Sequence, residues 1–235
     1  ILNLQNNEGE DDDEDYTLCF AACNDLRGFI ATINGIPEGH PASFTCVLNC
    51  LEPNWARSLL LLLVALVFPP DTGAEIMLHM GHSAFLTAEM AALVRKKIRP
   101  LIAFGVEAGR ECGDDELVTR VFTFGTSAIR ICLEKQKWVY VLLLLDLDPA
   151  QFDQSREGNR LGYIAARLAY DETDSLHRHF FNISPSKRVS TKRFMREEIL
   201  LPFGAPLDDF NEPNFTFCEP LSKRWLFTRA PDPLT

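Results

Sequence analysis

The sequence CNDLRGFIATINGIP, residues 23–37, joins a short apolar run to a segment with helical spacing. The run before it, YTLCFAA at residues 16–22, has the composition of a β-strand. Gly35 and Pro37 are stop signals for the helix that follows. The turn between strand and helix either cradles a ligand or only shapes the fold. The apolar positions at helical spacing are Leu26, Phe29, Ile30 and Ile33.

The same order of elements then repeats. Residues 43–51, SFTCVLNCL, read as a second strand, and residues 53–68 read as a helix that ends at Pro69 and Pro70. Strand, helix, strand and helix thus follow one another with short connections, which indicates a parallel sheet flanked by helices. We therefore expect an α/β fold.

The rest of the chain is expected to be rich in helices, with one strand at residues 127–133. Pro100 lies inside a long apolar stripe and should kink or split that helix. The predicted organisation is an acidic disordered lead at 1–15, a domain with helical insertions at 16–205, and a Pro-rich extended arm at 206–235. The predicted helices after residue 74 cover residues 74–101, 135–145, 160–170 and 184–201.

Composition limits the classes of partner. The 235 residues carry a formal net charge of −10, which argues against broad binding to nucleic acid or anionic membranes. The longest apolar run, residues 59–68, is half the length of a membrane span of about 20 residues.

With seven cysteines and no secretory signal, we expect reduced thiols and a cytoplasmic protein, with the nucleus as the alternative. Because the chain starts at Ile1, we expect a piece of a longer protein.

Four residues near the first two strand ends are candidates for cofactor binding: Asn24, Asp25, Asn49 and Glu52. A dinucleotide or S-adenosylmethionine site needs glycines in the first turn, because they let the ligand approach the backbone amides. The turn here has none, since Gly28 already lies within the predicted helix. Asp25 can cap the helix, and its carboxylate would repel an anionic ligand. A structural turn is favoured, with cofactor binding as the alternative.

The cysteine and histidine pairs favour structural roles. Cys19 and Cys23, like Cys46 and Cys50, are four residues apart, which on a strand separates two side chains by about 13 Å. That is too far for a shared zinc ion, so we expect buried thiols and no metal. His79 and His82 are three apart on a predicted helix, and no metalloprotease pattern accompanies them.

A basic helix face is predicted near the C-terminal end. Arg188, Lys192 and Arg196 recur every four residues in SKRVSTKRFMR, residues 186–196. The face is either simply solvated or binds an acidic protein segment. The run EGEDDDED at residues 8–15 is one such segment within this chain.

Three motifs together resemble the domain of unknown function 4470 family. Its members show a G-D-L-R-N turn, a strand ending in N-D, and A-R-N before a Leu-rich helix. This chain has NDLRG at 24–28, LNC at 48–50 and ARS at 56–58. Residues 188–217 are similar to a later family segment, R-F-x-x-x-G-I-L-L-P-F-G, followed by a P-N-P-T-like motif.

The resemblance implies a Rossmann-like, degenerate methyltransferase-like parallel sheet with an eroded cofactor loop. The family occurs in fungal proteins beside a MYND zinc finger, which this chain lacks, and opens an axonemal dynein assembly factor. Its activity is not established. Asn24 and Gly28 depart from the family turn, which weakens a ligand-binding role.

The function we expect is a non-catalytic protein-interaction or scaffold module with no cofactor. The missing glycine loop, the lack of a convergent catalytic set and the basic helix favour it. The alternative is an S-adenosylmethionine-dependent methyltransferase, with Asp25, Asn49 and Glu52 lining its pocket.

Overall fold

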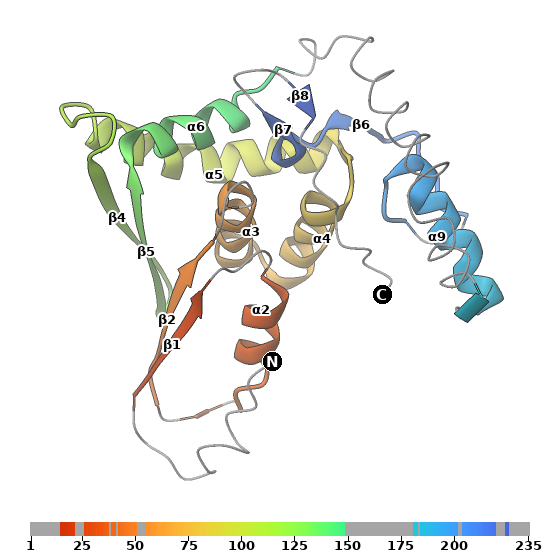
Figure 1. Ribbon diagram of the computed structural model, residues 1–235, viewed down its shortest axis with the longest axis horizontal. Helices are drawn as coiled ribbons and strands as arrows, with labels where there is room; N and C mark the ends of the chain where they lie inside the picture. The colour runs from red at the N-terminus through yellow and green to blue at the C-terminus, as the bar shows by residue number, and fades with distance from the viewer. Residues whose placement is uncertain are drawn as a thin grey trace. The chain divides into compact units, whose positions relative to one another are not determined.

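The computed structural model contains helices and several two-stranded sheets (Figure 1). It describes residues 15–21, 26–37, 39–40, 42–50, 55–148, 181–182, 184–201, 204–219 and 224–225. The chain divides into two compact units, residues 1–62 and residues 63–235.

The first unit begins with a β-α-β sequence. Strands β1 (Tyr16–Ala21) and β2 (Phe44–Asn49) are parallel and in register from end to end, and helix α2 (Arg27–Asn34) connects them. Helix α3 (Trp55–Val67) follows β2, and the boundary between the units falls within it. The predicted strand–helix–strand–helix order is therefore confirmed.

One face of the β1–β2 pair is partly covered. The burial of both strands alternates between half-buried and exposed residues, as expected where one face packs and the other meets water. The rings of Phe20 and Phe29 meet edge to face with their centroids 5.5 Å apart, which places α2 against the half-buried face. At the other end of the pair, Tyr16 and Phe44 stack at 5.2 Å.

The α/β class is confirmed, but only a two-stranded parallel sheet is present in the described part of the chain. The other paired strands are antiparallel: β3 with β6, β4 with β5, and β7 with β8. The larger Rossmann-like sheet stays a prediction.

The second unit is built on helix α5, which packs against α6, β3, β4 and β6. Strand β3 pairs with β6 across more than 120 residues of sequence, and β4 forms a hairpin with β5. Its elements are α4 (Pro70–His82), β3 (Phe85–Thr87), α5 (Ala88–Ala108), β4 (Leu117–Phe124), β5 (Ser127–Glu134), α6 (Lys135–Leu145), α9 (Pro185–Glu197), β6 (Phe210–Pro213), η2 (Phe215–Phe217), β7 (Cys218–Glu219) and β8 (Arg224–Trp225).

Helix α5 runs unbroken through Pro100. The split that Pro100 predicted does not occur, because Pro100 and Lys96, four residues before it, both lie on the exposed side. There the carbonyl that loses its amide partner meets water instead of the core. The buried side of the helix carries Val94, Ile98 and Ile102.

Helices α5 and α6 are in close contact at Gly105. A Cβ atom at Gly105 would lie 2.2 Å from the ring of Trp138, so only glycine fits there. The indole Nε1 of the buried Trp138 donates to the carbonyl of Val118 at 3.0 Å. One side chain thus joins both helices to the β4–β5 hairpin.

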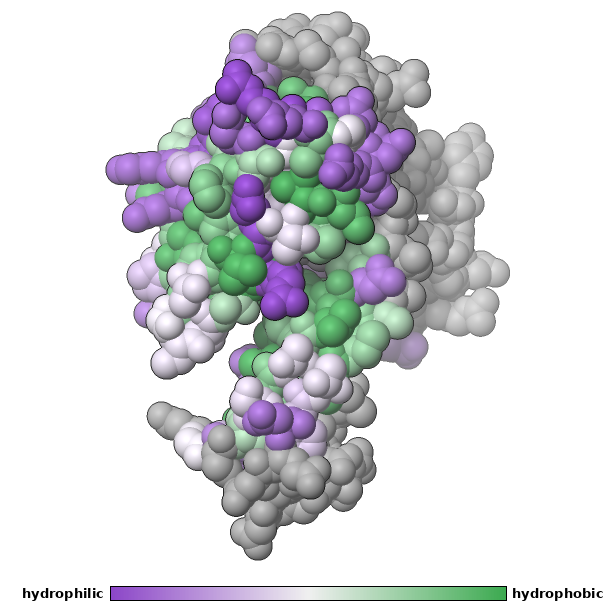
Figure 2. Space-filling view, turned by 90° about the vertical axis from the view of Figure 1, so that its left-hand side faces the viewer, coloured by the Kyte–Doolittle hydropathy of each residue, from purple (hydrophilic) through white to green (hydrophobic). Residues whose placement is uncertain are grey.

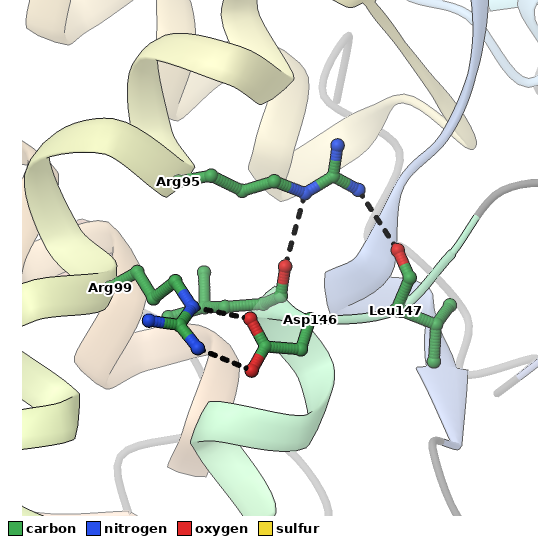
Figure 3. Close-up of polar contacts among 5 residues, drawn as sticks. Arg95, Arg99, Asp146 and Leu147 are labelled. Atoms are coloured by element: carbon green, nitrogen blue, oxygen red, sulfur yellow. Dashed lines mark hydrogen bonds and ion pairs between the residues drawn. The ribbon is translucent and has the colours of Figure 1, made fainter.

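Two arginines of α5 hold the C-terminal end of α6 (Figure 3). Arg95 donates through Nε to the carbonyl of Leu145 at 3.0 Å and through Nη2 to that of Leu147 at 3.1 Å. Arg99 forms a bidentate ion pair with the carboxylate of Asp146. Its Nε donates to Oδ1, and its Nη2 donates to Oδ2 at 2.9 Å. Arg95 also lies 3.7 Å from Glu212, so it links the end of α6 to β6.

The predicted arm at 206–235 contains paired backbone. Within it, β6 pairs with β3, and residues 213–218 are buried. The predicted helix at 160–170 and the acidic lead up to residue 14 lie outside the described residues. The domain boundaries stay a prediction.

Candidate functional site

Of the four residues predicted to bind a cofactor, the structure describes Asn49. Asn49 ends β2, is exposed, and lies opposite Ala21, the last residue of β1. Because the two strands are parallel, both carboxyl ends reach the same edge, where open α/β sheets bind their ligands. The other predicted cofactor residues, Asn24, Asp25 and Glu52, lie outside the described residues.

The prediction of buried thiols is wrong for Cys19. Cys19 is exposed, whereas Cys46 is half-buried on the other face of the same two-stranded sheet. Burial raises the pKa of the Cys46 thiol. Within the described ranges, no group of three His, Cys, Asp or Glu side chains could hold a metal ion.

The family-like ARS segment lies at the start of α3. Ala56 and Ser58 are buried there, and burial lowers the pKa of Arg57 to about 10.

The predicted basic face lies on α9. Lys192 of this face is exposed, as is Lys187, which the predicted face did not include, and neither makes an ion pair or hydrogen bond with the described residues. Arg188 is half-buried and donates to the carbonyl of Phe181 at 3.3 Å. Arg193 donates to the carbonyl of Ala205 at 2.6 Å. Arg196 lies in the same helix, and its side chain is outside the description.

Helix α9 is anchored by the residues that follow it. Glu198 adopts a left-handed conformation with φ of 54° and ends the helix. Its carbonyl then accepts from the backbone amide of Ala84 at 2.7 Å. The amide of Leu200 donates to the hydroxyl of Ser83 at 3.0 Å. The junction between α4 and β3, residues 83–84, therefore positions the end of the basic helix.

Asn214 closes the same junction from the other side. Its buried Nδ2 lies 3.2, 3.0 and 2.6 Å from the carbonyl oxygens of His79, Met80 and Ser83, so two N–H groups serve three acceptors. Its backbone amide donates to the carbonyl of Ala84 at 2.9 Å. The bonds to Met80 and Ser83 supply donors at the C-terminal end of α4, where helix carbonyls run out of amide partners. The carbonyl of His79 already accepts from the backbone amide of Ser83 at 2.8 Å.

Thr216 completes the closure. Its hydroxyl oxygen lies 2.8 Å from both the carbonyl of Met80 and Oδ1 of Asn214, which share its single proton. Its backbone amide donates to Oδ1 at 3.1 Å. The sequence PNFT at 213–216 is thus a buried clamp on α4. In the sequence this motif resembles a family segment, and that resemblance predicts no role for it. The sequence feature that could have indicated this role is an Asn and a Thr two residues apart directly after Pro213.

His79 is a buried member of this network. Its Nδ1 lies 3.0 Å from the hydroxyl of Ser83, and its ring lies 4.8 Å from that of Phe210. Burial lowers the pKa of His79, and the charge of Glu75 opposes that shift. The Ser83 hydroxyl already accepts from Leu200, so it is suited to donate to a neutral His79 Nδ1. The predicted structural role of His79 agrees with this arrangement.

A family model described as a domain of unknown function (DUF4470) matches residues 1–86. The match covers the elements from β1 to α4 and ends within β3. The resemblance drawn from the three early motifs is thereby confirmed for this part of the chain. Comparison with curated proteins and with solved structures gives no match.

In the described part of the chain, no helix combines the length and apolar character needed to cross a membrane.

Replacing Asn214 by Ala should lower the free energy of unfolding by about 2–3 kcal/mol, because the Ser83 carbonyl loses its donor in a buried place. Urea unfolding followed by circular dichroism measures the change. Asn49→Ala, at an exposed strand end, is the matched control and should stay within about 0.5 kcal/mol of the wild type. Equal stability of Asn214→Ala and the wild type would contradict the clamp.

Lowering the pH should reduce the free energy of unfolding of the second unit, because His79 takes up a proton more readily in the unfolded chain. Because its pKa is lowered in the folded state, the unfolded chain binds the proton first, below the ordinary value of 6.5. The stability contribution is complete above 6.5 and is lost as pH falls toward the folded pKa. Urea midpoints between about pH 7.5 and pH 5.5 should fall less steeply in His79→Gln than in the wild type. His40→Gln, in the other unit, serves as control, and identical slopes in all three proteins would refute this role.

Proposed function

We propose that this chain is a non-catalytic protein-interaction or scaffold module that binds an acidic segment of a protein partner through α9. The module is built on a degenerate methyltransferase-like fold, and the parallel β1–α2–β2 arrangement supports this part of the proposal. No cofactor takes part, and the protein acts in the cytoplasm, with the nucleus as the alternative.

The basic surface of α9 carries the proposal. Lys187 and Lys192 are exposed without a counter-charge among the described residues, and Arg188 lies between them in sequence. The first turn of α9 contains no acidic residue. Positive side chains near a helix N-terminus are unfavourable because they face the positive end of the helix dipole. An acidic partner would offset that cost.

The charge of the whole chain supports an acidic protein rather than a nucleic acid as the partner. With a net charge of −10, the chain repels a polyanion at long range. A short carboxylate-rich peptide on α9 is repelled less than a long nucleic acid, because physiological salt screens charges beyond about 8 Å and the peptide meets only the surface around that helix. The anchored C-terminal end of α9 also limits the ordering cost of binding.

The double variant Lys187→Glu/Lys192→Glu should bind an acidic peptide about tenfold more weakly, because two attractive charges become repulsive. The probe is a fluorescent peptide of sequence EGEDDDED, followed by anisotropy at two salt concentrations. Lys96→Glu/Lys97→Glu, two exposed lysines of α5, makes the same charge change elsewhere and should bind more tightly than the α9 variant. Equal loss in both variants would reduce the effect to net charge and remove α9 from the proposal.

An S-adenosylmethionine-dependent methyltransferase is the second candidate. The aligned carboxyl ends of β1 and β2, with Asn49 exposed at that edge, favour it. Calorimetry with S-adenosylmethionine and S-adenosylhomocysteine separates the two functions. Saturable binding that Glu52→Ala or Asn49→Ala weakens would support the enzyme, whereas no heat up to millimolar ligand would support the interaction module.

A further inference from the structure

Strand β5 has an open edge. Among the described residues it is hydrogen-bonded to β4 alone, so its other side presents backbone groups with no strand partner. The hairpin lies at the left of Figure 1, with β4 outermost and β5 on its inner side. Figure 2 views the molecule from the β4 side, where apolar side chains reach the surface between charged ones. An unprotected strand edge is a template for another strand.

The backbone direction of β5 identifies the residues that face this edge. The amide of Lys135, the residue after β5, donates to the carbonyl of Glu116 on the β4 side at 3.0 Å. The backbone N–H and C=O groups of successive residues point to alternate sides of a strand. Those of the odd-numbered residues of β5 therefore point toward β4. The amides and carbonyls of Arg130, Cys132 and Glu134 therefore face the open edge.

The side chains of these residues share the outward face of the hairpin. Arg130 and Cys132 are exposed, and Arg130 has no ion pair or hydrogen bond with the described residues. Glu134 is partly exposed and contacts Lys137 at 3.6 Å and Gln136 at 3.1 Å, both through Oε2. Its Oε1 is left to accept another donor. A positive charge, a thiol and a negative charge thus follow one another at every second residue.

We propose that the β5 edge pairs antiparallel with β5 of a second copy of this chain, with the two-fold axis at Cys132. In that register Cys132 faces its own copy, and Arg130 of each chain lies opposite Glu134 of the other. All three pairs join residues whose backbone groups face the edge, as an antiparallel ladder requires. The two hairpins become one four-stranded sheet.

Charge complementarity selects a second copy as the occupant. The pattern is its own complement, because a two-fold axis turns the order positive–thiol–negative onto its reverse. Opposite charges directly across a strand pair are stabilising and like charges are destabilising. Moving the axis by one residue, to Ile131, places Arg130 opposite Cys132 and forms no ion pair, so the charges also fix the register.

Cross-linking tests the contact at the axis. Directly opposed residues of an antiparallel ladder have Cα atoms about 5.5 Å apart, so a short bismaleimide should join two Cys132 thiols through two thioether bonds. The wild-type protein should give a covalent dimer and Cys132→Ser should not. Undiminished dimer in Cys132→Ser would overturn the proposal, because the chain has six other cysteines.

Charge reversal tests the register. By sedimentation, Arg130→Glu and Glu134→Arg should each weaken the dimer about tenfold or more, and the double variant Arg130→Glu/Glu134→Arg should restore it, because the swapped pattern is again self-complementary. Thr123→Glu, exposed on the outward face of β4, is the control and should leave the dimer intact. A wild-type monomer at high micromolar concentration, or a double variant as weak as the single ones, would refute the pairing. Rescue by the double variant also excludes misfolding as the cause of loss.

Discussion

The amide of Asn214 binds three carbonyl groups at the C-terminal end of α4, and the second unit is organised around that contact. Helix ends leave backbone carbonyls without partners, and a buried carbonyl without a donor is costly. Asn214 supplies the donors from a segment more than 130 residues away in sequence. It thereby ties the late part of the chain to α4, the first complete helix of the unit.

The junction that Asn214 closes also positions α9. The backbone of residues 83–84 binds Asn214 on one side and the residues after α9 on the other. Arg95 makes a second connection, since it contacts both the end of α6 and Glu212 of β6. The proposed partner surface on α9 is therefore presented by a network of buried backbone bonds rather than by local packing of the helix alone.

Local patterns predicted the elements whose period is visible in a short window. The strands at 16–21 and 44–49 and the helix Lys135–Leu145 were predicted nearly to the residue, because alternation and apolar spacing are strong there. Strand β3 was missed, since three residues carry no period and its partner β6 is far away in sequence. Strand β4 was also missed, because adjacent apolar residues at 117–118 and 121–122 hide in the sequence the alternation that its burial shows in the sheet with β5.

The candidate site was predicted less completely than the fold. The basic helix follows from charge spacing, and the aligned strand ends follow from the β-α-β order. The role of Asn214 could not be predicted, because it depends on three carbonyls that tertiary structure alone brings together. The exposure of Cys19 was likewise set by which face of β1 is covered, which its apolar neighbours did not indicate.

Amide hydrogen exchange in the Asn214→Leu variant tests the central claim most directly. Leucine keeps a similar volume and removes the donors. If Asn214 holds the junction, the amides of Ala84 and Leu200 should exchange faster than in the wild type, while Ile102 in the middle of α5 should keep most of its protection. Unchanged protection of Ala84 and Leu200 would contradict the account.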